Sequence, residues 1–202
     1  AAIANGFTAS TLVSGAPIVV EDDIGGDWRP QNYSKKVFGP TRLREALSIS
    51  LNLVSVRLVR ALGIEVVRDY LERFGFDRSR LPQGLALALG SATMTPMEIA
   101  RGYAVFANGG YRIEPFFIVR IEDQEGAIIE YANREMICTE CAAPNTEESE
   151  AQKRAVDLRF ADRVISEENA FIVDSLMQEV VKNGTARSAL SLGRRDLAGK
   201  TG

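Results

Sequence analysis

The stretch GPTRLREALSISLNLVSVRLVRALG, residues 39–63, contains two helical hydrophobic patterns with a break between them. Thr41 is placed to open the first helix. The regular helical spacing of apolar residues is interrupted over residues 48–52 and then resumes. Serine and asparagine favour such a break because their side chains compete for backbone hydrogen bonds. The stretch therefore predicts two helices joined by a tight corner that carries Ser50 and Asn52.

The rest of the chain mixes helical and strand patterns. A short apolar run and a long loop rich in glycine, proline and aspartate are expected over residues 14–40. We expect helices over residues 64–74, from Thr95 to Asn108 and from Ser166 to Asn183. Residues 116–133 alternate around a glycine turn, which predicts a β-hairpin. Residues 133–165 are polar and aperiodic, which favours a surface insertion. The fold class is α+β.

Composition narrows the possible chemistry. The chain has 202 residues, a formal net charge of −3 and no histidine. The charge gives no basic surface for nucleic acid, and no apolar run is long enough to cross a bilayer, so we expect no membrane contact from this segment. The absence of histidine excludes Ser-His-Asp catalysis and histidine-ligated zinc. Acid–base chemistry must then fall to lysine, carboxylates, tyrosine or cysteine.

Several smaller features have ordinary structural interpretations. Cys138 and Cys141 lack the further ligands of a zinc site, which leaves a short-range disulfide or two free thiols. No metal or cofactor is therefore expected. Trp28 is interpreted as a packing residue of its loop, Gly90 and the serine after it as a turn, and the acidic run at 21–23 as a solvated turn rather than a calcium site.

The C-terminal stretch DLAGKTG, residues 196–202, allows two interpretations. A phosphate-binding loop requires a glycine at position 194, but the glycine is Gly193, and no following helix is present to face a phosphate. The other interpretation is the Lys-Thr-Gly element of serine acyl-transfer enzymes, which accompanies an S-x-N triplet. Ser50-Leu51-Asn52 is such a triplet and precedes Lys200 in the required order. We therefore favour the acyl-transfer site, with a strand leading into Lys200.

Longer segments carry a wider resemblance. GGDWRPQNY at 25–33, the stretch at 39–63, LALALGSATMTPMEIARGYAVFANGG at 85–110 and LAGKTG at 197–202 resemble the transpeptidase domain of class A (bifunctional, 1a-type) penicillin-binding proteins. The resemblance covers the chain except the insertion. It implies part of the serine transpeptidase fold shared with β-lactamases, mainly its helical portion with a β-hairpin and the Lys-Thr-Gly strand.

The resemblance also implies a function and residue roles. The family cross-links peptidoglycan stem peptides ending in D-Ala-D-Ala through a serine acyl-enzyme, and β-lactams trap that serine. Ser50 would relay a proton to the leaving amine, and Asn52 would bind the donor peptide and orient the nucleophile's lysine. Lys200 would supply positive charge, Thr201 would bind the substrate carboxylate, and Gly202 would let the strand approach the substrate.

One element of the family is missing from these residues. No serine is followed by lysine three positions later, so S-x-x-K is absent from the 202 residues. We expect it, and the glycosyltransferase domain of the parent synthase, to lie upstream, on the periplasmic side of the bacterial inner membrane. The segment alone is then expected to be inactive and marginally stable. The alternatives are a non-catalytic penicillin- or peptide-binding module and the disfavoured nucleotide-binding protein.

Overall fold

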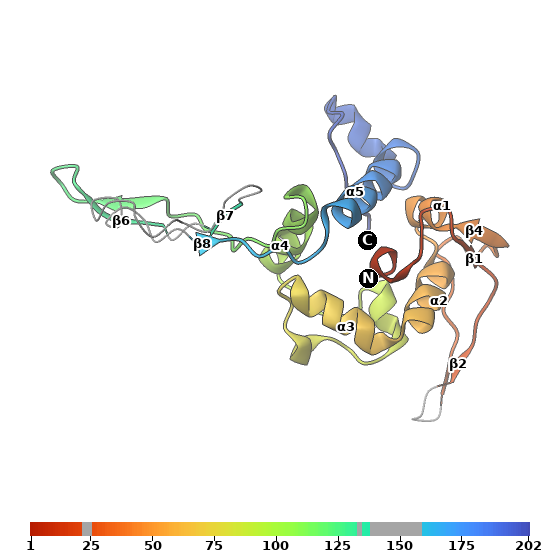
Figure 1. Ribbon diagram of the computed structural model, residues 1–202. Helices are drawn as coiled ribbons and strands as arrows, with labels where there is room; N and C mark the ends of the chain where they lie inside the picture. The colour runs from red at the N-terminus through yellow and green to blue at the C-terminus, as the bar shows by residue number, and fades with distance from the viewer. Residues whose placement is uncertain (22–25, 133–134, 138–158) are drawn as a thin grey trace.

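The computed structural model describes residues 1–21, 26–132, 135–137 and 159–202. Within these ranges, five α-helices make up the body and pairs of short strands lie on its periphery (Figure 1). The helices are α1 (Leu43–Ser48), α2 (Asn52–Leu62), α3 (Ile64–Arg73), α4 (Pro96–Ala107) and α5 (Glu167–Lys182). Four 3-10 turns connect them: η1 (Ile3–Asn5), η2 (Arg78–Arg80), η3 (Leu85–Leu89) and η4 (Arg187–Leu192).

The corner between α1 and α2 is where the sequence predicts it. The first helix ends at Ser48, and the amide of Leu51 donates to the Ala46 carbonyl at 2.8 Å before α2 begins at Asn52. The expected start at Thr41 was wrong. Residues 40–42 are instead strand β4 (Pro40–Arg42), which pairs with β1 (Leu12–Ser14), and the helix begins at Leu43.

The other expected helices are confirmed, with their ends set by local chemistry. Thr95 and Glu98 form a capping box at the start of α4: the Glu98 amide donates to Thr95 Oγ1 at 3.2 Å, and the Thr95 amide donates to Glu98 Oε2 at 2.7 Å. The hydroxyl of Ser166 caps α5 by accepting from the Asn169 amide at 3.3 Å. Glycine in the left-handed conformation follows α3 at Gly75, with φ of 88°.

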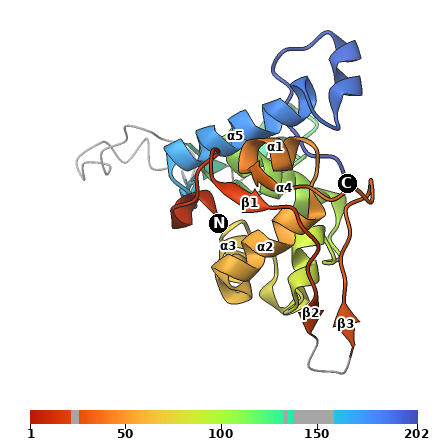
Figure 2. The same cartoon turned by 90° about the vertical axis from the view of Figure 1, so that its right-hand side faces the viewer.

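The strands form two-stranded pairings in the described residues. The hairpin expected over 116–133 is present as β5 (Arg120–Glu122) and β6 (Ile128–Tyr131), turning at Gly126. Another antiparallel pair is β2 (Val20–Glu21) with β3 (Asp27–Trp28), and β7 (Glu135–Met136) runs parallel to β8 (Arg159–Phe160). Figure 1 shows β5 to β8 along an arm that projects from the end of α4, and Figure 2 shows β2 and β3 extending away from the helices.

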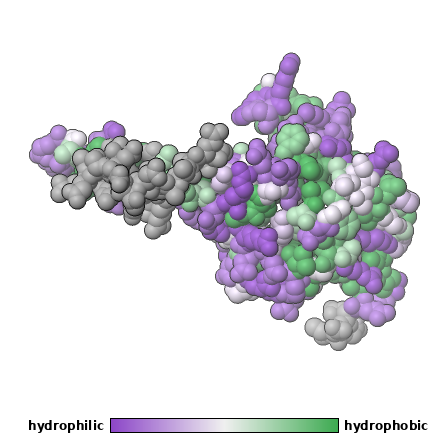
Figure 3. All heavy atoms as spheres, in the orientation of Figure 1, coloured by the Kyte–Doolittle hydropathy of each residue, from purple (hydrophilic) through white to green (hydrophobic). Residues whose placement is uncertain are grey.

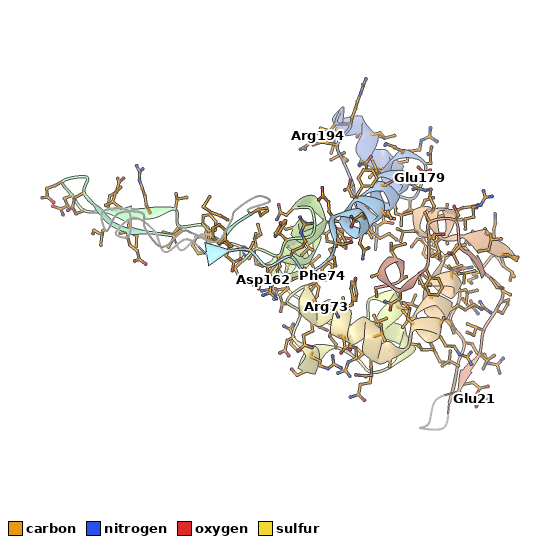
Figure 4. All side chains as sticks on the ribbon, viewed as in Figure 1. Glu21, Arg73, Phe74, Asp162, Glu179 and Arg194 are labelled. Carbon is orange, nitrogen blue, oxygen red and sulfur yellow. The ribbon has the colours of Figure 1, made fainter. Side chains whose placement is uncertain are left out.

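Two clusters of buried apolar side chains hold the helices together. Leu43 and Ala46 of α1 pack with Leu51 and Val54, so this cluster stabilises the corner between α1 and α2. The second cluster joins α3, α4 and the start of α5: Phe74, Val105, Ile165 and Ala170. The ring centroids of Phe74 and Phe106 lie 5.3 Å apart, and Figure 4 shows Phe74 between α3 and α4. Figure 3 shows apolar surface (green) among the helices, with polar residues around it.

Other predictions have mixed outcomes. Cys138, Cys141 and the aspartates at 22 and 23 lie outside the described residues, as does most of the expected insertion. The end of that segment belongs to the body, because Ala161 and Ile165 are buried. Trp28 is half-buried opposite Val20, and Gly90 ends η3 in the left-handed conformation, as a turn residue should. No helix in the described residues is long and apolar enough to span a membrane.

Candidate active site

Ser50 lies at the corner between α1 and α2 in a backbone conformation that few side chains adopt. Its φ is 57°, and it is one of two non-glycine residues with a left-handed backbone in the described part of the chain. For a residue with a Cβ this conformation costs about 1–2 kcal/mol. The surrounding contacts, including the Ser50 amide bonded to the Leu47 carbonyl at 3.2 Å, hold the strained residue in place.

Asn52 and the loop before β4 fix the other side of the corner. The side-chain nitrogen of Asn52, Nδ2, donates to the Gln31 carbonyl at 2.9 Å. The neighbouring Asn32 is 4% exposed, accepts from the Leu53 amide at 3.2 Å and donates to the Lys36 carbonyl at 2.9 Å. Asn32 therefore satisfies one of the free amides at the start of α2 and ties the 31–36 loop to it. Neither Gln31 nor Asn32 was among the predicted site residues.

Lys200 comes to this corner from 150 residues away in the sequence. Its Nζ donates to Ser50 Oγ at 2.7 Å and to the Thr201 carbonyl at 2.6 Å. The Gly199 amide also donates to the Met177 carbonyl of α5 at 3.4 Å, which places the segment along that helix. In Figure 1 the C-terminal end accordingly lies between α5 and α1. The structure thus brings together Ser50 and Lys200 but bonds Asn52 to Gln31 instead.

The prediction of a strand that leads into Lys200 was wrong for these residues. Residues 194–202 have no strand assignment, and the interactions of their backbone given above are with a helix and a side chain. A strand requires a hydrogen-bonded partner strand, which the described residues do not provide here. Lys200 is therefore positioned by the hydrogen bonds of its own side chain and by the backbone hydrogen bond of the preceding Gly199.

The environment of Lys200 favours its neutral form more than water does. Partial burial lowers the pKa of its ammonium group below the usual value, because removal from water penalises the charged form. Its two hydrogen-bond acceptors, a hydroxyl and a carbonyl, carry no full charge to offset that penalty. A lysine in this state can both attract an anion and exchange a proton with a hydroxyl group.

Thr201 contacts a further residue that the sequence did not predict to be part of the site. The hydroxyl oxygens of Thr201 and Thr185 are 2.5 Å apart. Thr185 follows Asn183-Gly184 at the end of α5, and the Asn-Gly pair indicates only where a helix ends. Gly202 is exposed at the end of the described chain. No group of three or more possible metal ligands occurs among the described residues.

Comparison with known proteins places these features in a family. The family model described as the penicillin-binding protein transpeptidase domain matches residues 1–202. The chain belongs to this family. The recognition from the sequence is thereby confirmed, and so is the transpeptidase fold.

Relatives of the penicillin-binding protein 1A type match over the whole chain. Penicillin-binding protein 1A of Pseudomonas aeruginosa is 43% identical, and that of Vibrio cholerae is 39% identical. The crystal structure of penicillin-binding protein 1A from Haemophilus influenzae superposes with a TM-score of 0.87 at 36% identity over the whole chain. The chain spans only 28%, 26% and 32% of these three proteins, respectively. Penicillin-binding protein A from M. tuberculosis, at 21% identity, a TM-score of 0.66 and 90% of this chain, shows the fold alone.

Proposed function

We propose that this chain forms part of a serine D,D-transpeptidase that cross-links peptidoglycan stem peptides, within a bifunctional synthase of the 1A type. The observation that carries the proposal is the 2.7 Å hydrogen bond from Lys200 Nζ to Ser50 Oγ. It joins the S-x-N and Lys-Thr-Gly triplets, which are far apart in the sequence. A phosphate-binding loop would instead aim its lysine at a phosphate cradled by a helix N-terminus.

Ser50 is assigned the transfer of a proton to the leaving amine. The Ser50 oxygen accepts a hydrogen bond from Lys200, so the hydroxyl proton is directed elsewhere and can be donated to an amine. Lys200 can then return a proton to Ser50, because partial burial lowers its pKa. The pair replaces the histidine that the sequence lacks.

The Lys-Thr-Gly segment is assigned the recognition of the donor carboxylate. The Lys200 charge attracts the anion, the Thr201 hydroxyl donates a hydrogen bond to it, and Gly202 allows close approach. Asn52 binds the donor peptide and orients the nucleophile's lysine. Because its amide nitrogen is already bonded to Gln31, its Oδ1 is the atom assigned to accept from that lysine.

The nucleophile is assigned to an S-x-x-K serine outside these 202 residues. Its hydroxyl proton passes to the lysine of that motif while its oxygen attacks the penultimate D-Ala carbonyl. The carbon–nitrogen bond to the terminal D-Ala breaks, and the amine leaves with the proton from Ser50. An acceptor stem-peptide amine then takes the acyl group and gives up a proton, and the serine leaves with its hydroxyl proton restored. β-Lactams acylate the same serine. The parent protein would work on the periplasmic side of the inner membrane together with its glycosyltransferase domain.

The test uses the parent protein with a fluorescent penicillin and a peptide ending in D-Ala-D-Ala. We expect label that survives denaturation, release of D-Ala from the peptide, and loss of both when the S-x-x-K serine becomes alanine. Label that washes out on denaturation, with no D-Ala released, would contradict the proposal and favour a non-catalytic binding module.

A further inference from the structure

Thr185 bridges the two halves of the candidate site. It follows α5, and its amide donates to the Ser48 carbonyl at 3.0 Å, two residues before Ser50. Its hydroxyl oxygen lies 2.5 Å from that of Thr201. One residue therefore contacts both the corner that carries Ser50 and the segment that carries Lys200.

Gly184 makes the contact with the corner a close one. A Cβ added at this position would lie 2.1 Å from the Ser48 carbonyl oxygen and 2.9 Å from the Val180 Cα. Both are backbone atoms that cannot move aside cheaply, so only glycine allows the chain to pass this close. The backbone of Thr185 is consequently held against the last turn of α1, and its side chain has a defined direction.

The hydroxyl pair has a simple proton balance. Each hydroxyl has one proton to donate, so one of the two oxygens is the donor and the other the acceptor. If Thr185 donates, the proton of Thr201 remains available to a ligand, and the hydrogen bond it accepts strengthens its own donation. If Thr201 donated to Thr185, it could not also donate to a substrate carboxylate.

The pair is not part of the hydrophobic core. Thr185 is exposed, and it lies outside both clusters of buried apolar side chains. A hydrogen bond between accessible hydroxyls adds little to stability, since water replaces it. Conformational stability therefore does not account for a 2.5 Å contact on this side of the site.

We infer that Thr185 is a positioning residue for carboxylate recognition: its hydroxyl donates to Thr201 and so directs the Thr201 proton toward an anionic substrate group. The inference rests on the proposed function and refines it. Thr185 does not touch the reacting atoms in this assignment, and it acts through Thr201. The ligand class is a carboxylate adjacent to an acyl donor, as in a peptide C-terminus or a penicillin.

The test compares acylation of the parent protein by penicillin G and by its methyl ester. Thr185→Val retains the shape of the side chain but removes the hydroxyl, and Thr185→Ser restores the hydroxyl. The matched control is Thr8→Val, because Thr8 and Thr11 form another exposed hydroxyl pair at 3.2 Å. We expect Thr185→Val to lower the second-order acylation rate about 10-fold for the free acid and less than about 2-fold for the ester. Thr185→Ser and Thr8→Val should stay close to the parent.

The ratio of the two rates decides the outcome. It does not depend on the fraction of active protein, so it remains valid if Thr185→Val folds poorly. An equal loss for acid and ester, or no loss, would overturn the role of Thr185. The proposed function fails separately, when Ser50→Ala and Lys200→Ala leave penicillin acylation unchanged.

Discussion

Replacing Ser50 separates the contribution of its hydroxyl from that of its backbone. Ser50→Ala and Ser50→Gly both remove the oxygen that accepts from Lys200 Nζ at 2.7 Å. Only glycine relieves the left-handed backbone, whose φ is 57°. Activity should therefore fall in both variants, whereas stability should differ between them.

The magnitudes follow from the geometry of the corner. Loss of the hydrogen bond to Lys200 should cost about 1 kcal/mol in either variant, since the pair is only partly buried. Relief of the left-handed strain returns about 1–2 kcal/mol to the glycine variant. The greater freedom of glycine in the unfolded chain takes back about 0.4–1 kcal/mol. Ser50→Gly should thus be roughly 0.5–1 kcal/mol more stable than Ser50→Ala.

Two measurements on the parent protein check this prediction. In thermal unfolding followed by circular dichroism, the transpeptidase domain with Ser50→Gly should melt about 1–4 °C above that with Ser50→Ala. Acylation by a fluorescent penicillin should fall about 10²-fold or more in both, as expected for loss of a proton donor. A glycine variant that melts below the alanine variant, or that keeps its acylation rate, would refute the reasoning.

Two further predictions concern stability, each followed by thermal unfolding. Gly184→Ala should lower the free energy of unfolding by about 3 kcal/mol, because the new Cβ meets the Ser48 carbonyl. Gly39→Ala, where a new Cβ has no atom within 4 Å, should change the stability little, and equal effects of the two substitutions would contradict this reasoning. Asn32→Ala should lower the free energy of unfolding by about 1–3 kcal/mol, since it leaves the buried Leu53 amide without an acceptor and removes the bond to the part-buried Lys36 carbonyl. An unchanged melting temperature would count against this role of Asn32.

The local chemistry of the chain made most of the helices predictable. The capping box of Thr95 and Glu98 and the serine cap of α5 lie within three residues of the groups they satisfy, so a sequence displays them directly. The break at Ser50 was also visible, because the hydrophobic spacing itself is interrupted. Its left-handed backbone was not, since that conformation depends on how α1 and α2 pack.

Non-local pairing explains what the sequence did not reveal. The sequence predicted a helix start at Thr41, where the structure has strand β4. A local pattern does not show this strand, because its partner β1 is far away in the sequence and pairs Leu12 with Arg42 across 30 residues. The contact of Lys200 with Ser50 was expected only from the order of two triplets. The contact of Thr185 with Thr201 had no such signal, because the preceding Asn-Gly indicates only the end of a helix.

The role of Lys200 is tested by the acylation rate of the parent protein after this lysine is replaced. Lys200→Ala removes the ammonium group bonded to Ser50, and Lys182→Ala removes a lysine of α5 that donates to Gln178 at 2.9 Å. We expect Lys200→Ala to lower the rate of acylation by a fluorescent penicillin about 10²–10³-fold, and Lys182→Ala to leave this rate within about 2-fold of the parent protein. Equal rates for both variants and the parent protein would contradict the claim that this segment supplies part of a serine transpeptidase site.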